Sequence, residues 1–505
     1  HQGGYPTEFY PFGSSAIDLI VWLASFGQMN IPMAHTWAVA IVFVLPAIAF
    51  FGIAHLTDLS PWIALIATFG HLCVRGWWWS GGSYELIEWG LITNVLATAL
   101  VFLALVAVAK LLDGGSNRWI GPIILLIGWA EVTNPRSAVA VGTILLAGAI
   151  VWFTSANRIE TSWWRLVLPI GLGLGLAAPV LLPLFRYRDL YFFVNYSTYD
   201  NVTAWWHSSI QAVSFPFFVL GLLGCLISLG PGNAIVERLL AWAFLIYAGI
   251  TLYLVQIDWP STWTEQLETT RLMPFQRLLL FALAAIAIGR LAQLTQSPLR
   301  NLTVLAVAIL IPLFYVWAPP SFIPESDRGL VRVGTMAEPG IADLQTAVTA
   351  GDAAAPPDTA MLILATTAYW HDHMWANLWT DRLLFYDDWL WYWQTQNVGD
   401  YDPLTEHAYP MDSSTINEAY LHTHGIGVIV VTGEAKPFAA TAPFLTRIRS
   451  GIYDVYTVNS PTTLATLDAQ NLVSAIRDET VTIQGTSGGG TLTVRVNWFP
   501  RWQAS

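Results

Sequence analysis

The feature that most constrains this chain is a series of apolar segments, between residues 17 and 317, that are long enough or nearly long enough to cross a bilayer. About 20 apolar residues span the hydrocarbon core, and shorter segments are tolerated inside a packed bundle. Residues 319–505 are more polar, rich in aromatic residues, and contain no further segment of this kind. The sequence therefore predicts an α-helical polytopic membrane bundle in residues 1–318 and a separate domain in residues 319–505.

By this length criterion we count about ten candidate spans. They cover residues 33–56, 62–74, 87–109, 119–132, 138–154, 165–185, 210–229, 236–256, 275–289 and 301–317. The composition agrees, because 55% of residues are hydrophobic and only 11% are charged, whereas soluble domains carry roughly 25% charged residues. The net charge of −12 argues against a nucleic-acid partner. Cys73 and Cys225 lie far apart in apolar stretches, so no disulfide framework is indicated.

Orientation in the membrane follows from the basic residues, because short cytoplasmic loops collect Lys and Arg. Lys110, Arg118, Arg238 and Arg290 lie in or beside alternate connections, which we assign to the cytoplasm. The domain that follows the last span is then extracytoplasmic, and the protein is placed in the plasma (inner) membrane. The same alternation puts His1 outside, so an N-terminus that starts in the cytoplasm would need an odd number of upstream spans, in the simplest case one.

The extracytoplasmic domain is predicted to be α+β. Residues 361–365 and 427–431 are apolar runs typical of buried strands. Residues 480–484 and 491–497 alternate in β fashion on either side of the Gly-rich segment 485–490. That arrangement predicts a β-hairpin at the end of the domain.

Candidate catalytic acids lie where polar residues gather at the outer ends of the spans, because ionisable groups at membrane depth are costly without a task or a partner. They are Glu8, Asp18 and Glu85. Asp18 either faces a polar cavity from a short interfacial helix or is an exposed carboxylate that the helix dipole favours. Glu85 shares a helical face with Glu88, so the pair either binds a sugar and shares acid/base work, or faces water in an aromatic belt.

Candidate substrate-binding residues combine arginines with aromatic rings. They are Arg186, Arg188, Trp205, Trp206 and His207 in one outer connection, and Arg271 before a later span. Forked arginine donors recognise phosphate, and tryptophan rings pack on sugar faces or lipid chains. This set suits a lipid-phosphate donor. The alternative for each arginine is contact with lipid headgroups or snorkelling.

A metal site is only weakly indicated. His371 and His373 in a Tyr-Trp-His-Asp-His sequence would share one face of a strand, but no further ligand follows at a fixed spacing. A surface or hydrogen-bonded role is the alternative. We therefore assign no metal ligands and no cofactor, and a divalent metal remains open.

Four sequence stretches, in this order, carry a family resemblance. They are Gly4-Tyr5-Pro6 with Phe9-Tyr10-Pro11, Gly81-Gly82-Ser83-Tyr84-Glu85 with Gly90, residues 271–280, and Asn497-Trp498-Phe499-Pro500-Arg501-Trp502-Gln503-Ala504. In these stretches the chain resembles bacterial multipass proteins of the GT-C glycosyltransferase superfamily, especially the 6-pyruvoyl-tetrahydropterin-synthase-related membrane proteins. The resemblance covers most of the chain.

The resemblance implies transfer of a sugar from a polyprenyl-phosphate-linked donor at the outer membrane face, with inversion and with an acidic residue as general base. In such enzymes the base usually belongs to the first outer loop, which is largely absent here, so Glu8, Asp18, Glu85, Arg186 and Arg188 stay candidates. Implied partners are membrane lipid and the donor. The alternatives are a noncatalytic subunit of a membrane assembly, with membrane-protein partners, and a lipid or sugar transporter.

Overall fold

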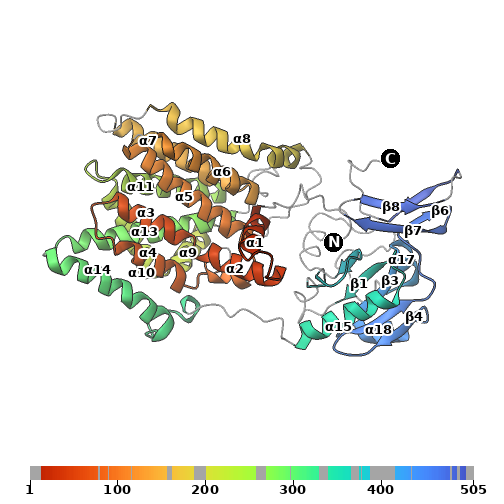
Figure 1. Cartoon of the computed structure of the whole chain (residues 1–505). Coiled ribbons are helices and arrows are strands. Elements are labelled where there is room, and N and C mark those ends of the chain that lie inside the picture. Colours follow the sequence, from red (N-terminus) through yellow and green to blue (C-terminus); the bar gives the residue numbers. More distant parts are fainter. Residues whose placement is uncertain are drawn as a thin grey trace. The chain divides into compact units, whose positions relative to one another are not determined.

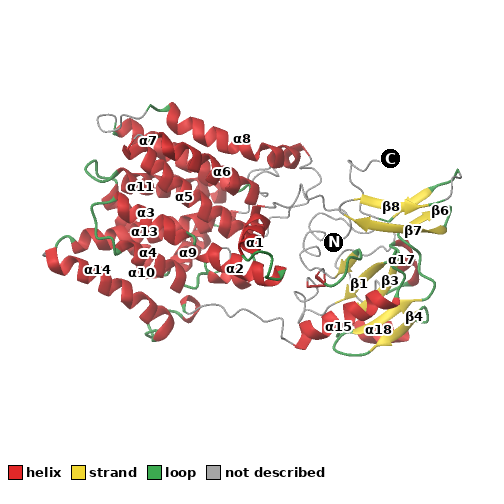
Figure 2. Cartoon of the chain, in the orientation of Figure 1, coloured by secondary structure: helices red, strands yellow, loops and turns green. Residues whose placement is uncertain are grey.

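The computed structural model describes residues 13–77, 80–88, 90–114, 116–155, 162–186, 201–256, 269–295, 297–328, 339–364, 375–376, 378–386, 416–433, 435–477, 480–485 and 489–495. Contacts within the chain divide it into two compact units. The described residues up to 328 form a helical unit, and those from 339 onward form a unit of strands and helices (Figures 1 and 2). Residues 319–328, after the last apolar segment, belong to the helical unit.

The helical unit consists of apolar helices joined by short turns. Its α-helices are α1 (Gly13–Ala24), α2 (Ile31–Val44), α3 (Pro46–Leu56), α4 (Ile63–Cys73), α5 (Ile92–Gly114), α6 (Ile120–Thr133), α7 (Ser137–Thr154), α8 (Trp164–Arg186), α9 (Val202–Val213), α10 (Phe215–Ser228), α11 (Ile235–Gln256), α13 (Met273–Ala292) and α14 (Ser297–Pro312). Short 3-10 or π-helical turns are η2 (Tyr84–Glu88), η3 (Asn117–Trp119), η5 (Thr269–Leu272), η6 (Leu313–Trp317) and η7 (Glu325–Asp327).

Within the described residues, seven helical segments are long and apolar enough to cross a membrane. They are Ile31–Leu56, Ile92–Gly114, Ser137–Thr154, Trp164–Pro183, Ile235–Val255, Thr269–Ala292 and Leu299–Trp317. The number rises to eight if α9 and α10 together count as one bent span. These helices have the length and composition expected of an integral membrane protein.

Fewer of the described helices reach this length than the roughly ten spans predicted from sequence. The predicted span 62–74 forms only the eleven-residue α4, which is about 17 Å long, whereas the hydrocarbon core is about 30 Å thick. The predicted span 119–132 forms the fourteen-residue α6, about 21 Å long. α4 is apolar because most of its residues are buried inside the unit, whereas α6 also exposes apolar residues such as Leu125, so apolar composition alone does not fix the number of crossings.

Two helices of the unit meet at a sharp corner. α9 and α10 are bent by 101° relative to each other, and the single residue between them, Ser214, has φ 67° and ψ 156°. That combination is a region of backbone space occupied almost only by glycine. The Ser214 hydroxyl is bonded to the Tyr315 hydroxyl of η6 at 2.5 Å. This bond helps to hold the strained corner against the end of α14.

Hydrogen bonds identify the two ends of the helical unit. At one end, which we call the Glu85 end, Asn94 near the start of α5 is bonded to Glu85 of η2, to Asn134 after α6 and to the backbone of Arg271 before α13. At the opposite end, the Arg290 end, Arg290 of α13 is bonded to Glu237 of α11. The connections predicted to face outward around residues 85, 134 and 271 therefore meet at one end.

The second unit contains two sheets. Its helices are α15 (Pro339–Ala354), α17 (Glu418–Thr423) and α18 (Ala435–Thr441). Its strands are β1 (Ala360–Leu364), β2 (Leu384–Tyr386), β3 (Ile426–Val431), β4 (Leu445–Arg449), β5 (Asp454–Val458), β6 (Ala465–Leu467), β7 (Gln470–Arg477), β8 (Thr480–Gln484) and β9 (Leu492–Val494). The first sheet has the order β2-β1-β3-β5-β4, and β1 is parallel to both of its neighbours.

Helices cover both faces of the first sheet. Met361, Ile363 and the residues alternating with them in β3 pack in one apolar cluster with α15, and Leu362, Leu364 and their counterparts pack in another with α17 and α18. Fully buried runs such as these are typical of parallel strands covered on both sides. The strands predicted at 361–365 and 427–431 correspond to β1 and β3, and the unit contains both strands and helices as expected.

The predicted terminal hairpin is wrong. The second sheet has the order β8-β7-β6-β9, so β8 pairs with β7 and β9 pairs with β6. The Gly-rich segment therefore connects the two edges of a four-stranded sheet. A local turn signal cannot distinguish this longer connection from a hairpin, because both join strands that alternate in the same way.

Candidate functional site

The loop after α4 is shaped by glycines that allow close backbone contacts. Gly81 has φ +78°, which other residues rarely adopt, and a Cβ atom added there would lie 2.7 Å from Pro274 Cβ. A Cβ atom on Gly82 would overlap the carbonyl group of Arg75. The Gly-Gly pair therefore lets this loop lie directly against the start of α13, and it brings η2 and Glu85 into the unit.

Glu85 is fully buried, and both of its carboxylate oxygens accept hydrogen bonds. Oε2 accepts from the Gly81 backbone N–H, and Oε1 accepts from the Asn94 side-chain amide at 2.7 Å. Burial raises the pKa of Glu85, and these bonds together with the nearby charges of Arg271 and Arg277 oppose that rise. Neutral donors thus hold the carboxylate in place, so the expectation that Glu85 faces water in an aromatic belt is wrong.

Asn94 connects four segments at this end. Its amide nitrogen donates to Glu85 and, at 3.2 Å, to the carbonyl oxygen of Arg271, while its oxygen accepts from the Asn134 amide at 3.1 Å. The Asn134 oxygen in turn accepts from the backbone N–H of Arg136 at 3.1 Å. We call Glu85, Asn94 and Asn134 the buried polar chain.

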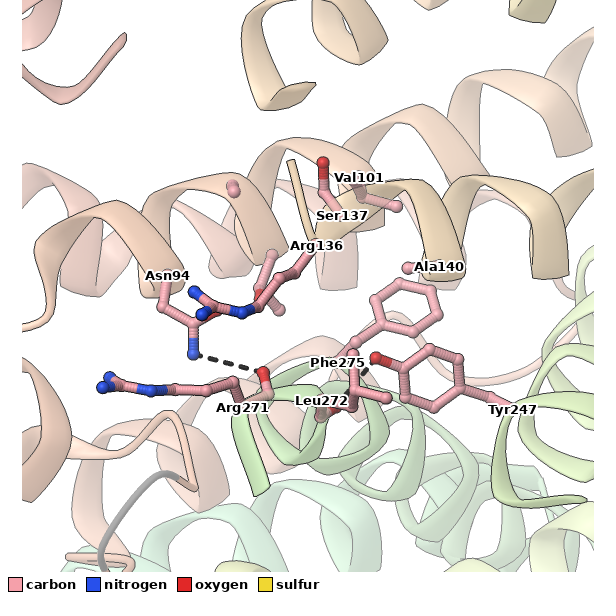
Figure 3. A pocket seen from close by; sticks show the side chains of 11 residues that line it. Asn94, Val101, Arg136, Ser137, Ala140, Tyr247, Arg271, Leu272 and Phe275 are labelled. Atoms are coloured by element: carbon pink, nitrogen blue, oxygen red, sulfur yellow. Dashed lines mark hydrogen bonds between the residues drawn. The ribbon is translucent and has the colours of Figure 1, made fainter. Parts of the chain in front are cut away.

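A small cavity lies beside this chain, and two arginines line it. Its lining residues are Asn94, Ala97, Thr98, Val101, Arg136, Ser137, Ala140, Tyr247, Arg271, Leu272 and Phe275. Figure 3 shows the guanidinium groups of Arg136 and Arg271 extending in the same direction, near the Asn94 side chain. The Ser137 hydroxyl points away from them and donates to buried Glu131 at 2.9 Å.

The opposite wall of the cavity is apolar and aromatic. The Phe275 and Tyr247 rings meet edge to face with centroids 5.0 Å apart, and the Tyr247 hydroxyl donates to the Leu272 carbonyl at 2.9 Å. The cavity thus has positive charge on one side and apolar surface on the other. Such a wall suits a ligand that joins an anionic group to hydrocarbon.

Arg277 lies deeper at the same end and has a structural role. It is fully buried, and its guanidinium group donates to the carbonyls of His71 at 3.0 Å, Val74 at 2.7 Å and Ala212. These carbonyls belong to the C-terminal ends of α4 and α9, where the helix dipole favours a cation. Arg277 therefore joins the ends of two helices to the start of α13.

The structure brings together two of the residues selected from sequence. Glu85 and Arg271 meet through Asn94. Asp18 instead lies in α1, partly exposed, and pairs with His35 of α2 at 3.2 Å. Arg186 is the exposed last residue of α8. Glu8 and Arg188 lie outside the described residues, as do His371 and His373.

The aromatic candidates fall on α9. Trp205 is buried, Trp206 is 46% exposed and His207 is exposed. α9 is linked to α13 by a 2.9 Å bond from the Gln276 amide to Ser209. None of these three residues lines the cavity. Trp205 packs inside the unit, so a direct part in binding is not supported for it.

Sequence reasoning missed Asn94, Arg136 and Tyr247 as parts of the site. Asn94 did carry a signal, because it is an amide within the otherwise apolar first turns of a long span, and buried polar residues in membrane helices usually bond to a neighbouring helix. From sequence, Arg136 was expected to be a structural ion-pair partner of Glu131, and the structure places it in the lining of the cavity.

No group of three or more His, Cys, Asp or Glu side chains is placed to hold a metal ion within the part of the chain that the structure describes. No protein family model matches the chain, and comparison with curated proteins gives no significant match. The site must therefore be interpreted from its own geometry.

Proposed function

We propose that this protein is a GT-C-like membrane glycosyltransferase that takes a sugar from a polyprenyl-phosphate-linked donor at the outer membrane face, and that the Glu85 end is where the donor binds. The observation that carries the proposal is the cavity lining, which combines Arg136 and Arg271 with the apolar side chains of Phe275 and Leu272. A phosphate attached to a lipid chain presents both kinds of surface at once. The extracytoplasmic position of residues 319–505 belongs to the same proposal.

Arg136 and Arg271 are assigned to the donor phosphate. Guanidinium groups bind phosphate oxygens through paired, charge-assisted hydrogen bonds. In transfer, the acceptor oxygen forms a bond to the anomeric carbon as the bond from that carbon to the phosphate oxygen breaks, and the phosphate leaves with the electron pair. Two cations beside that oxygen stabilise the negative charge it gains. The cavity has room for little more than a water molecule, so binding the phosphate end of the donor requires the side chains of its wall to move apart.

Glu85 is poorly suited to act as the general base. A base must reach the acceptor hydroxyl, whereas Glu85 is fully buried and both of its oxygens already accept hydrogen bonds. We assign the base to none of the residues discussed so far. Glu8 stays a candidate from sequence, and Asp18 is engaged with His35.

The decisive experiment is transfer to water, which needs no knowledge of the acceptor. Purified protein in vesicles is supplied with a radiolabelled polyprenyl-phosphate sugar, and release of the sugar is followed. Arg136→Ala and Arg271→Ala are each expected to reduce the rate by about tenfold or more, because each removes a charge-assisted phosphate contact. The control is Arg118→Ala in η3, where the side chain lies over the Trp119 ring.

A second candidate function is transport of a lipid phosphate or sugar, and the corner at Ser214 favours it. Broken helices whose ends face a polar site are common in transporters, and α9 and α10 form one bent pair. Binding of the donor without sugar release, together with movement of a labelled lipid phosphate across vesicles, would favour transport. Donor binding with neither activity would favour a noncatalytic subunit, and no binding at all would contradict the proposed function.

A further inference from the structure

The buried polar chain has a single direction. Each amide donates toward Glu85, from Arg136 N–H to Asn134 Oδ1, from Asn134 Nδ2 to Asn94 Oδ1, and from Asn94 Nδ2 to Glu85 Oε1. The orientation of Asn94 is fixed by chemistry, because a flipped amide would place its oxygen against the Glu85 carboxylate and the Arg271 carbonyl. Hydrogen bonds aligned in this way polarise and strengthen one another.

Both cavity arginines are attached to this chain through their backbones. Asn94 holds the carbonyl of Arg271, and Asn134 holds the N–H of Arg136. The buried polar chain thus connects the turn before α7 with the 3-10 turn η5. These two segments are more than a hundred residues apart in sequence. The buried polar chain therefore sets the distance between the backbones from which the Arg136 and Arg271 side chains extend.

We infer that Glu85 is a positioning residue, which acts through Asn94 and Asn134 to hold Arg136 and Arg271 at the spacing needed to bind one phosphate group together. This inference rests on the proposed function, because it assigns the two arginines to a phosphate. It adds that phosphate binding depends on the ionisation of Glu85, which the two arginines alone would not require. The Glu85 carboxylate holds both N–H donors best when it is ionised, since protonation would make one of its oxygens a weaker acceptor.

Protonation of Glu85 would interrupt the chain at its first link. The protonated oxygen would then face either Gly81 N–H or the Asn94 amide and would accept that hydrogen bond more weakly. The charged side chains that act on Glu85 in the described part of the chain are Arg271 and Arg277, and both favour the ionised form. Burial acts in the opposite direction and raises the pKa of Glu85, so its ionisation falls within a higher pH range than that of an exposed glutamate.

The variant that isolates this role is Glu85→Gln, which keeps the size of the side chain. The new amide presents a donor to Gly81 N–H or to the Asn94 amide. If Asn94 flips to accept it, Asn134 must flip as well, and Arg136 N–H loses its acceptor. A second variant, Asn134→Leu, removes both hydrogen bonds of the Asn134 side chain and leaves Glu85 and Asn94 bonded to each other.

The experiment measures binding of farnesyl phosphate and of inorganic phosphate to the full chain in detergent, by calorimetry over a range of pH. We expect farnesyl phosphate to bind the wild type more tightly than inorganic phosphate, because the cavity has an apolar wall. Arg136→Ala and Arg271→Ala should each weaken binding about tenfold or more. Glu85→Gln and Asn134→Leu should weaken it by about three- to tenfold, with Arg118→Ala as the unchanged control.

The pH profile separates positioning from general loss of structure. Affinity of the wild type should fall as the pH drops through the raised pKa of Glu85, whereas Glu85→Gln should bind weakly at every pH and lack that step. The phosphate itself titrates near pH of about 6, but it does so equally in both proteins, so the difference between their profiles reports on Glu85. Thermal unfolding of each variant checks that it is folded.

The outcomes distinguish the inference from the proposed function. If both arginine variants lose binding while Glu85→Gln and Asn134→Leu bind as the wild type does with parallel pH profiles, the positioning role is overturned and the phosphate site stands. If neither arginine variant changes binding, or the wild type binds neither probe, the proposed phosphate site fails and the inference fails with it. If Glu85→Gln does not fold, Asn134→Leu decides alone.

Discussion

The two ends of the helical unit each bury a glutamate, and they satisfy it in opposite ways. At the Arg290 end, Glu237 accepts directly from the Arg290 guanidinium group at 2.6 and 3.3 Å, and Asp58 joins the same cation at 3.2 Å. At the Glu85 end, the carboxylate accepts from a backbone N–H and an amide. At the Arg290 end the buried carboxylate is bonded to a cation, whereas at the Glu85 end it is bonded to neutral donors and two arginines line the neighbouring cavity. The first arrangement joins helices, and the second suits a binding site.

The largest expected effect is on stability at the Glu85 end. It tests whether Arg277, whose guanidinium group is bonded to backbone carbonyls, is needed to hold the helices together. Arg277→Met would leave three carbonyls at the ends of α4 and α9 without their donor, and we expect it to lower the free energy of unfolding by about 4 kcal/mol. Arg277→Lys should recover only part of this loss, because one ammonium group cannot reach all three carbonyls. Denaturant unfolding in detergent measures both. A Met variant as stable as the wild type would show that Arg277 is not a structural joint.

The next effect breaks the ion pair at the opposite end. Arg290→Leu leaves fully buried Glu237 without its partner and should cost about 3 kcal/mol. The double variant Glu237→Leu with Arg290→Leu should be clearly more stable than Arg290→Leu alone, because no buried charge remains. Comparing the two single variants, the double variant and the wild type gives the coupling energy directly. If the double variant is as unstable as Arg290→Leu, the pair is not what stabilises this end.

A smaller loss of stability is expected from a change in the loop that carries Glu85. Gly82→Ala forces a methyl group against the Arg75 carbonyl, so we expect a loss of about 1–3 kcal/mol together with weaker donor binding. Gly142→Ala in α7 is the matched control, since nothing lies within 4 Å of the added Cβ atom. That change should be neutral or should stabilise by up to about 1 kcal/mol. Equal effects at the two positions would contradict the close contact.

The smallest effect concerns an ion pair in the second unit, which is partly exposed to solvent. The Arg449 guanidinium group bonded to Asp343 lowers the pKa of that carboxyl. A lowered carboxyl pKa adds stability above the ordinary value of about 3.9, and this stability is lost as the pH falls through the lowered pKa. Asp343→Asn should therefore reduce protection of β4 and β5 against hydrogen exchange at pH 7 more than at acid pH. If Asp343→Asn reduced protection equally at pH 7 and at acid pH, Asp343 would not be the source of the pH dependence.

The architecture was predictable as far as composition and periodicity reach. Long apolar segments identify membrane helices because lipid requires both an apolar surface and an internally bonded backbone. The same rule does not separate the short helices α4 and α6 from full-length spans, because both are as apolar as the longer helices. Runs such as those of β1 and β3 were identified as buried strands for an equally simple reason, namely their covered faces.

The candidate site was predictable only in part. Glu85 and Arg271 stand out in sequence because charges are rare near apolar segments. Their connection could not be foreseen, since it runs through Asn94 and Asn134, and these bonds depend on how α5, α6 and α13 are packed against one another. A single sequence does not contain that register. Neutral residues that connect a site through hydrogen bonds are therefore harder to predict from sequence than its charged residues.

Arg277 has a consequence for how the chain is assembled in the bilayer. The helix ends that accept its hydrogen bonds belong to α4 and α9, and both are synthesised before α13. An arginine in an isolated helix costs several kcal/mol in lipid, so α13 gains most if it reaches these earlier helices as it leaves the translocation channel. A chain that stops before Arg277 would leave the carbonyls of His71, Val74 and Ala212 without this donor.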